Sequence, residues 1–428
     1  MESSARRRLD CLSRHLVLPQ VFNHVLEPVF LSGQKSKHWE AEPVIIGGMV
    51  LDIHATPSIP ANPRTTNPGK VNYALGGVAR NVAECMSKLG TKPLMVSALG
   101  LDMAGNLLLE NWRSAGLSVE GILRKQEIET PVVSNIFDVH GELAAGVASV
   151  EAIEKFLTPE WIRKFKYNVD SAPVLMVDAN LNLPALEASC QMAAVSKIPV
   201  WFEPVSVAKS RRIVSIANYV SFASPNEDEL IAMANALSGA EVFSYSPVES
   251  DNSRNKFSVA CKFQMLKPAI WMLLEKGIKI VLVTLGRDGV FLCSKGGPSS
   301  MRIGHERIIQ HASNGDLYET VTVGCPSNLI RGTTKSESSS LLFAVHFPAL
   351  PASVVRVTGA GDCLVGGTLA SICIGLDLLQ SVAVGIAAAK ATVEAETNVP
   401  HGFSVASIAD DASLVYSAAK VICHEPMV

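Results

Sequence analysis

The amino-acid sequence predicts an α/β fold of three layers, in which helices cover both faces of a mostly parallel sheet. Short apolar runs alternate with amphipathic helical segments from Val44 onward. This alternation is typical of parallel strands joined by crossover helices. The chain has 428 residues, 48% of them hydrophobic, which is enough to bury the core of one large domain or of two smaller ones.

Strands are predicted at the short apolar runs. These runs are Val44–Leu51, Pro93–Leu99, Val174–Val177, Pro199–Phe202, Tyr219–Ala223 and Lys279–Leu285. The amphipathic segments between them predict helices at Ala79–Leu89, Gly105–Ala115, Leu183–Val195, Glu227–Asn235 and Phe263–Glu275. A longer apolar stretch from Leu364 to Val393 is interrupted by Asp377, Gln380 and Gly385. It therefore predicts two buried helices joined by a turn, and no membrane span.

The chain is expected to divide into a targeting or flexible segment over residues 1–42 and a domain over residues 43–428. The first segment contains Arg8-Leu9-x5-His15-Leu16, which resembles a type-2 peroxisomal targeting signal. These residues would share one face of a helix, so an import receptor could bind them together. The expected location is the peroxisome, with the cytoplasm as the alternative. Two Ser-rich stretches, about 239–257 and 296–353, are predicted to be insertions.

Composition argues against several classes of protein. The formal net charge is −3, and basic runs with interleaved aromatic residues are lacking, so neither a nucleic acid nor a membrane surface is expected as a partner. The nine cysteines are scattered and form no C-x-x-C pair. This pattern argues against a disulfide framework or a structural zinc site, and it favours a reducing compartment.

The most informative motif is Val357-Thr358-Gly359-Ala360-Gly361-Asp362, which precedes an apolar helical run. Its glycines let backbone N–H groups approach an anion closely, and the helix that follows adds the positive end of its dipole. Asp362 would lie in the first helical turn beside a transferring phosphate, where a base must be to take a proton from an attacking hydroxyl. The alternative is an ordinary glycine-rich helix start with a first-turn carboxylate.

A second glycine motif, Gly76-Gly77-Val78-Ala79-Arg80-Asn81, opens an upstream helix. Gly76 and Gly77 can admit a ligand hydroxyl close to the backbone, and Asn81 offers both a donor and an acceptor. The two motifs, in this order, resemble the paired signatures of the PfkB (ribokinase-like) carbohydrate kinases. The resemblance covers Val44 to about Gly402. It implies a ribokinase-like three-layer fold with a small β lid, and phosphoryl transfer from ATP with Mg²⁺.

The resemblance also implies roles for individual residues. Asp362 matches the catalytic base, and Gly359, Ala360 and Gly361 match the anion hole. Asp52, Gly76, Gly77 and Asn81 match acceptor-binding positions. For ATP, the matching positions are Asn226, Thr284, Gly286 and Gly289, and Glu229 would hold Mg²⁺ through water. Asp52, Asp178, Glu203, Asn226 and Thr284 each follow a predicted strand, so they are expected to line one crevice at the carboxyl edge of the sheet. Any one of them could instead cap a helix.

A finer resemblance is to the pseudouridine kinases of this family. The motifs that show this resemblance are Asn67-Pro68-Gly69-Lys70, Asp178-Ala179-Asn180, and Glu203-Pro204-Val205-Ser206 followed by Lys209. It implies that the 5′-hydroxyl of a nucleoside is phosphorylated, with Asn67, Lys70, Asp178 and Asn180 at the acceptor. Lys209 is assigned to the ATP phosphates, with a solvated surface lysine as the alternative, and Asn67-Pro68-Gly69 also fits a plain β-turn. Another sugar or nucleoside remains the alternative acceptor.

One position departs from the family pattern. Arg356 stands two residues before Thr358, where some members have an acidic residue that helps to hold a monovalent cation, so a requirement for such a cation stays open. Lid strands of this family often pair between subunits, which leaves a homodimer open as well.

Overall fold

The computed structural model describes residues 41–427 except residue 141 and the ranges 246–257, 298–315 and 327–340. The targeting motif at Arg8–Leu16 lies outside the described residues, as do large parts of both predicted insertions. The compact unit that contains the described residues spans Ala41–Val428.

A ten-stranded sheet forms its centre, in the order β14-β13-β12-β11-β10-β9-β8-β1-β4-β5. Seven strands, from β11 to β5 in this order, pair in parallel, whereas β12, β13 and β14 are added antiparallel at one edge. The bounds are β1 Val44–Ile46, β4 Leu94–Gly100, β5 Ile122–Lys125, β8 Leu175–Asp178, β9 Val200–Glu203, β10 Phe222–Ala223, β11 Ile280–Thr284, β12 Val290–Lys295, β13 Leu341–Phe347 and β14 Lys420–Pro426. The mostly parallel sheet is therefore confirmed.

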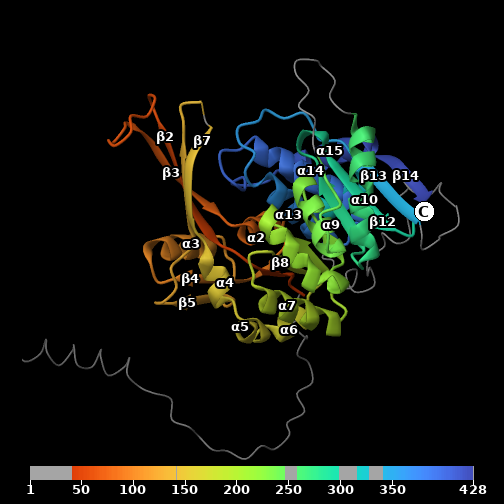
Figure 1. Cartoon of the computed structure of the whole chain (residues 1–428), viewed down its shortest axis with the longest axis horizontal. Coiled ribbons are helices and arrows are strands. Elements are labelled where there is room, and N and C mark those ends of the chain that lie inside the picture. The colour runs from red at the N-terminus through yellow and green to blue at the C-terminus, as the bar shows by residue number, and fades with distance from the viewer. Residues whose placement is uncertain (1–40, 141, 246–257, 298–315, 327–340, 428) are drawn as a thin grey trace, which may run out of the picture. The chain divides into compact units, whose positions relative to one another are not determined.

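Helices cover both faces of this sheet (Figure 1). One hydrophobic cluster contains Ile45 together with residues of α2 (Val78–Lys88), α13 (Ala360–Cys373), α14 (Leu378–Val393) and α15 (Val405–Ala418). The other cluster contains the neighbouring Val44 and Ile46 with the helices of the opposite face. Those helices include α7 Leu183–Val195, α9 Glu227–Ser238 and α10 Val259–Glu275. Alternate residues of β1 thus enter two separate cores, as they do in a three-layer α/β/α fold.

The remaining helices are shorter or lie at the edges. They are α3 Met103–Ser114, α4 Glu151–Phe156, α5 Pro159–Arg163, α6 Lys166–Ser171, α8 Val207–Ser210, α12 Asp316–Gly324 and the 3₁₀ turns Arg211–Ser215, Ala217–Tyr219 and Gly286–Asp288. None of the described helices is long and apolar enough to cross a membrane. The stretch Leu364–Val393 contains most of α13 and all of α14, two largely buried helices, as predicted.

A second sheet of four strands, in the order β3-β2-β6-β7, projects from this body (Figure 1). Its strands are β2 Val50–Pro57, β3 Gly69–Gly76, β6 Val132–Phe137 and β7 Leu143–Ser149. The pairs β2–β3 and β6–β7 are antiparallel, and β2–β6 is parallel. This sheet has the position and size of the predicted β lid.

The predicted single strand Val44–Leu51 is wrong, because the chain turns at Gly47 and Gly48 and divides this segment between the two sheets. The segment before the turn forms β1 of the central sheet, and the segment after it begins β2 of the lid. A Cβ at Gly47 would lie 2.2 Å from Asp178 Oδ2. Glycine is therefore needed where the backbone passes this buried carboxylate.

The predicted insertion over 296–353 is also wrong in part. Residues Leu341–Phe347 form β13, which is almost entirely buried between β12 and β14. The Ser-rich composition of the flanking residues hid this short apolar strand. The C-terminal β14 beside it was not predicted either, since its apolar run is only three residues long, Val421-Ile422-Cys423, and has no clear turn signal before it.

Candidate active site

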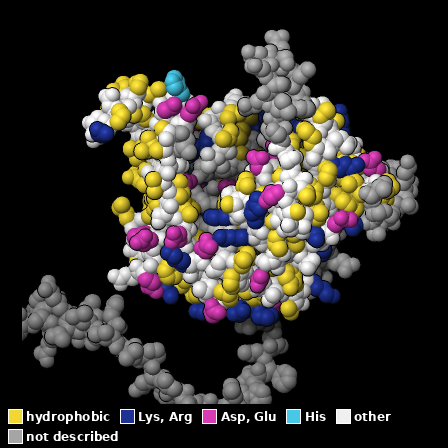
Figure 2. Space-filling model, in the orientation of Figure 1, with side chains coloured by type: hydrophobic (Ala, Val, Ile, Leu, Met, Phe, Trp, Pro, Cys, Tyr) yellow, Lys and Arg dark blue, Asp and Glu magenta, His cyan; other side chains and the backbone are white. Residues whose placement is uncertain are grey.

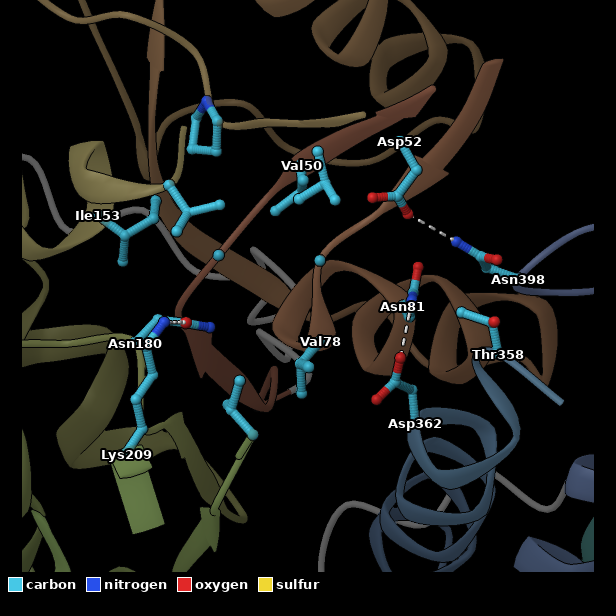
Figure 3. A pocket seen from close by; sticks show the side chains of 16 residues that line it. Val50, Asp52, Val78, Asn81, Ile153, Asn180, Lys209, Thr358, Asp362 and Asn398 are labelled. Atoms are coloured by element: carbon cyan, nitrogen blue, oxygen red, sulfur yellow. Dashed lines mark hydrogen bonds between the residues drawn. The ribbon is translucent and has the colours of Figure 1, made fainter. Parts of the chain in front are cut away.

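A cavity of about 260 Å³ lies where the lid sheet meets the carboxyl edge of the central sheet. Its lining comes from the lid, from α2, from the start of α13 and from loops after β7, β8 and β9 (Figure 3). The lining residues are Gly48, Val50, Asp52, Gly77, Val78, Asn81, Pro131, Val133, Val150, Ile153, Asn180, Val205, Lys209, Thr358, Asp362 and Asn398. A space of this size suits a small molecule and not a macromolecule.

Asp362 lies in the first turn of α13 and points toward this cavity (Figure 3). The helix begins after Gly359, which adopts φ 87° and whose added Cβ would lie 2.1 Å from the backbone oxygen of Asn398. Nothing lies within 4 Å of a Cβ built on Gly361. The first N–H groups of a helix have no partner within it, so this turn presents backbone donors beside the Asp362 carboxylate.

The Asp362 carboxylate is held by one neighbour on α2. Asn81 Nδ2 donates to Asp362 Oδ2 over 2.7 Å. The pKa of Asp362 is raised to about 6, mainly by burial and also by the nearby carboxylates of Asp178 and Asp52, while the Asn81 hydrogen bond and the charge of Arg80 oppose that shift. A carboxylate with a pKa near neutrality can accept a proton during catalysis and release it afterwards.

Asp52 projects from β2 into the same cavity, on the other side of Asn81 (Figure 3). Asn398 Nδ2 donates to Asp52 Oδ2 over 3.2 Å and to the backbone oxygen of Leu75 over 3.1 Å. Burial raises the pKa of Asp52, whereas Asn398 and the charges of Arg356 and Arg80 lower it. The carboxylate is thus placed to accept hydrogen bonds from hydroxyl groups.

The glycine pair makes room for these groups. A Cβ at Gly76 would lie 2.2 Å from Asp52 Oδ2, and one at Gly77, which has φ 98°, would lie 2.4 Å from the backbone oxygen of Gly48. Gly77 also precedes the first residue of α2 and lines the cavity. Both glycines are therefore required by close packing at the cavity wall, and of the two Gly77 faces the space that a ligand would occupy.

The opposite end of the cavity is mostly apolar, with two polar side chains (Figure 3). Lys209 Nζ donates to Asn180 Oδ1 over 2.7 Å, and Asn180 Nδ2 donates to Asp178 Oδ2 over 3.0 Å. The sequence assigned Lys209 to ATP, whereas the structure places it in the cavity that contains Asp52. Beside it, Val205 adopts φ 67°, a strained conformation for a β-branched residue and one that often occurs at functional sites.

Asp178 has a supporting position, not the ligand-contacting one that the sequence suggested. It is fully buried and accepts hydrogen bonds from Gly48 N at 2.9 Å and from the backbone and side chain of Asn180. Burial raises its pKa, and these hydrogen bonds oppose the shift. Asp178 therefore fixes the turn between the two sheets and the orientation of the Asn180 amide.

Asn67 and Lys70, predicted at the acceptor, do not line the cavity. Asn67 Oδ1 accepts from Asn62 N over 2.8 Å, and its Nδ2 donates to the backbone oxygens of Asn62 and Thr65. This is the turn role that its composition also suggested. Lys70 is an exposed residue of β3, paired with Thr56 near the tip of the lid.

The predicted nucleotide residues gather at the ends of β10 and β11. Asn226 and Thr284 form a parallel β-bridge, so the structure brings together two residues that are far apart in the sequence. Gly286 begins a 3₁₀ turn after β11, and a Cβ at Gly289, with φ 93°, would lie 2.0 Å from the backbone oxygen of Phe347. Only glycine fits this second position without rearrangement.

Glu229, the predicted metal residue, forms a capping box with Asn226 at the start of α9. Glu229 N donates to Asn226 Oδ1 over 2.8 Å, and Glu229 Oε2 accepts from Asn226 N over 3.0 Å. Burial raises the pKa of Glu229. Within the described residues, no group of three or more His, Cys, Asp or Glu side chains is arranged to hold a metal ion.

Several residues that hold the site together were not predicted. Asn398 supports Asp52, and Arg356 donates to Asn398 Oδ1 over 3.3 Å and approaches His54 Nδ1 at 2.7 Å. Arg80, which precedes Asn81 in the first glycine motif, donates to the side-chain oxygen of Asn81. No local pattern marks Asn398, because its role depends on a contact with a residue 346 positions away.

Comparison with known proteins agrees with this geometry. The profile of the pfkB family carbohydrate kinases matches residues 41–316 and 333–398. A pseudouridine kinase from Arabidopsis thaliana is 54% identical over 387 residues, which cover 90% of this chain and 100% of that protein. A pseudouridine kinase from Escherichia coli (strain K12) is 27% identical over 257 residues, which cover 60% of this chain and 74% of that protein.

The fold also has solved relatives. The structure of Arabidopsis thaliana ribokinase complexed with ribose and ATP superposes with a TM-score of 0.62 at 18% identity, covering 87% of this chain and 98% of that chain. Ribokinase from Thermotoga maritima superposes with a TM-score of 0.60 at 19% identity, covering 87% of this chain and 99% of that one. These likenesses confirm the ribokinase-like fold class. With a family profile that matches most of its length, the chain belongs to the pfkB family of carbohydrate kinases.

Proposed function

We propose that this chain is a pseudouridine kinase, which transfers the γ-phosphoryl group of ATP to the 5′-hydroxyl of pseudouridine. The observation that carries the proposal is the cavity in which Asp362 and Asp52 lie at one end and Lys209 and Asn180 at the other. In a bound nucleoside, the ribose would lie at the end with Asp362 and Asp52, and the polar base would lie at the end with Lys209 and Asn180. The identity of 54% to the Arabidopsis thaliana pseudouridine kinase supports the same acceptor.

Asp362 acts as the general base. Its carboxylate accepts the proton of the 5′-hydroxyl as the hydroxyl oxygen attacks the γ-phosphorus. The backbone N–H groups of Gly359 and Gly361, at the positive end of α13, stabilise the charge on the transferring group. The Ala360 N–H, predicted to join them, donates to the backbone oxygen of Val357 over 3.3 Å in this structure. Asp52, which Asn398 holds in place, and Asn81 position the ribose hydroxyls.

The apolar end of the cavity receives the base. Val133, Ile153 and Val205 offer apolar surface to a planar ring. Lys209 carries three N–H donors, of which one is given to Asn180, so the ammonium group can also donate to a base carbonyl. A charge-assisted hydrogen bond of this kind contributes about 1.5–3 kcal/mol.

ATP is placed along the ends of β10 and β11, where Asn226, Thr284, Gly286 and Gly289 gather. Mg²⁺ would neutralise phosphate charge on this side, and Glu229 would reach it through water from the first turn of α9. The exposure of Asn226 at this edge of the sheet supports this placement. We expect turnover to be lost completely when EDTA removes Mg²⁺ and to recover when Mg²⁺ is restored in excess.

A panel of acceptors tests the proposed substrate. Purified protein is assayed with ATP and pseudouridine, uridine, adenosine, inosine or ribose, and ADP formation is measured. We expect kcat/KM for pseudouridine to exceed the others by at least tenfold. A preference for ribose, adenosine or another nucleoside would overturn the pseudouridine assignment, and ADP formation equal to that in buffer for every acceptor would overturn the kinase assignment.

A homodimer formed through the lid is a further part of the proposal. Val71, Tyr73, Ile136 and Val147 are exposed and, by the strand register, share the lid face opposite Asp52. Figure 2 shows hydrophobic side chains along this arm of the molecule. Light scattering coupled to size exclusion should give a mass near twice the 45.6 kDa of the chain, and Tyr73→Lys should shift it to the monomer.

We also propose import into the peroxisome, which rests on the motif Arg8-Leu9-x5-His15-Leu16. The full chain with a fluorescent protein at its C-terminus should co-localise with a peroxisomal marker. The double variant Arg8→Ala, Leu9→Ala should remain in the cytoplasm. A diffuse signal from the unaltered chain would contradict this location.

A further inference from the structure

Arg80 is a buried cation immediately behind the cavity wall. It belongs to α2, is 3% exposed, and does not line the cavity. Its guanidinium forms an ion pair with Glu84 one helical turn later. Its Nη1 donates to the backbone oxygen of Leu75 over 2.8 Å and to Asn81 Oδ1 over 2.9 Å. The Arg80 guanidinium is therefore held in place by three partners: the Glu84 carboxylate, the Leu75 backbone oxygen and the Asn81 side chain.

The contact with Asn81 decides which end of the Asn81 amide faces the cavity. The oxygen and the NH₂ group of an asparagine have nearly the same shape, so the surrounding hydrogen bonds determine the orientation. The guanidinium has only donors and therefore attracts Oδ1. The NH₂ group must then point the other way, where it donates to Asp362 Oδ2 over 2.7 Å.

We propose that Arg80 is a positioning residue for phosphoryl transfer: it holds the Asn81 amide in the orientation that donates to Asp362. The inference rests on the proposed role of Asp362 as the general base. Arg80 does not line the cavity, and its effect on the reaction passes mainly through Asn81, with a smaller direct contribution from its charge. Without the guanidinium, the amide is free to turn, and its oxygen would then repel the carboxylate that it now supports.

The charges around Asp362 explain why this orientation matters. Asp52 on β2 and Asp178 on β8 favour the protonated form of Asp362, and Asp362 in turn raises the pKa of the buried Glu203 at the end of β9. Arg80 on α2 is the cation that opposes them, and the Asn81 hydrogen bond acts in the same direction. Loss of Arg80 removes both effects, so Asp362 would bind a proton at higher pH.

The experiment compares Arg80→Met and Arg80→Lys with Lys88→Met as a matched control. Lys88 pairs with the same Glu84 carboxylate from the other side, so its loss also deprives Glu84 of a cation. The assay is the pH dependence of kcat, with saturating ATP and with an acceptor that the wild-type enzyme phosphorylates in the panel above. Failure of the pseudouridine assignment thus leaves this test intact.

We expect Arg80→Met to lower kcat by about 10- to 100-fold at pH 7 and to move the acid limb of the profile upward by about 0.5–1 pH unit. Arg80→Lys should recover part of both effects, and Lys88→Met should change neither by more than a factor of two. KM for ATP should stay within twofold of wild type in all three variants. A lower kcat with an unmoved acid limb would assign Arg80 a merely structural role and overturn the proposal.

A double-mutant cycle tests whether the effect passes through Asn81. Arg80→Met is measured in the wild-type protein and in the Asn81→Ala variant. Because the amide is absent in that variant, Arg80→Met should lower its kcat by less than threefold. Additive losses would overturn the proposal. If Arg80→Met fails to fold, Glu84→Gln keeps the guanidinium but weakens its anchoring, and it should move the acid limb in the same direction by a smaller amount; no movement would count against the proposal.

Discussion

Asn81 and Asp362 are joined by a hydrogen bond of 2.7 Å although 281 positions separate them in the chain. The bond connects the two glycine motifs, since Asn81 follows the first on α2 and Asp362 ends the second on α13. Both helices pack against the same face of the sheet and share one hydrophobic cluster. The proposed catalytic carboxylate of Asp362 is thus positioned by the first turns of two packed helices and not by a loop.

Replacement of Asp362 by Asn should abolish most turnover. The amide keeps the shape of the side chain and can still contact Asn81, but it cannot take a proton from the acceptor hydroxyl. We expect kcat to fall by about 10²–10⁴-fold, with the dissociation constant of the acceptor changed by less than threefold. Isothermal titration and steady-state kinetics measure the two quantities separately. Turnover near that of wild type would remove Asp362 from the base role.

The rate should depend on pH in the direction set by Asp362. Burial and neighbouring carboxylates raise its pKa to about 6, and only the ionised form accepts a proton. The value of kcat should therefore be constant above pH 7 and fall as pH drops through about 6. Circular dichroism over the same range shows whether the protein stays folded. An acid limb centred near pH 4, the ordinary range of a carboxyl group, would contradict the assignment.

The sequence was sufficient for those parts of the site that local motifs encode. Gly359, Asp362, Gly77 and Asn81 lie in two short segments with a physical signature of their own, and all of them meet at one end of the cavity. Asn398 could not be found in this way, because an isolated asparagine near the end of a helix has no distinguishing pattern.

The errors in the predicted fold have related causes. The apolar run Val44–Leu51 continues without interruption by polar residues, so only the contact of Gly47 with Asp178, 131 positions later, reveals the turn. The strand Leu341–Phe347 was hidden because a Ser-rich stretch precedes it. In both cases the deciding contact is long-range, and composition within a window cannot report it.

Lys209→Met should separate contact with the acceptor from contact with ATP. Methionine preserves most of the aliphatic stem but removes the ammonium group that reaches Asn180. If Lys209 binds the base, KM for pseudouridine should rise by tenfold or more, which corresponds to loss of a charge-assisted hydrogen bond, while KM for ATP stays constant. Lys279→Met is the matched control, because Lys279 is an exposed lysine just before β11. A rise in KM for ATP alone would restore the phosphate role.

Gly359→Ala should damage both stability and activity. The residue has φ 87°, and the new Cβ would lie 2.1 Å from the backbone oxygen of Asn398. We expect the free energy of unfolding to fall by at least ~2 kcal/mol, together with a large loss of kcat, because the start of α13 must shift. Thermal unfolding measures the first effect. Gly402→Ala is the control, since it has open space around the added Cβ and no positive φ; equal effects of the two substitutions would contradict the argument.

Arg356 leads to a prediction about monovalent cations. Its guanidinium holds a positive charge at the position where the family resemblance implies an acidic residue in some members, and it is fixed there by Asn398 and His54. A buried cation next to this charge would be repelled, so replacement of potassium by choline at constant ionic strength should change kcat by less than twofold. Arg356→Ala, which frees Asn398 from one of its partners, should instead raise KM for the acceptor through Asp52. A strong activation of the wild-type enzyme by potassium would show that the guanidinium does not take the place of a bound ion.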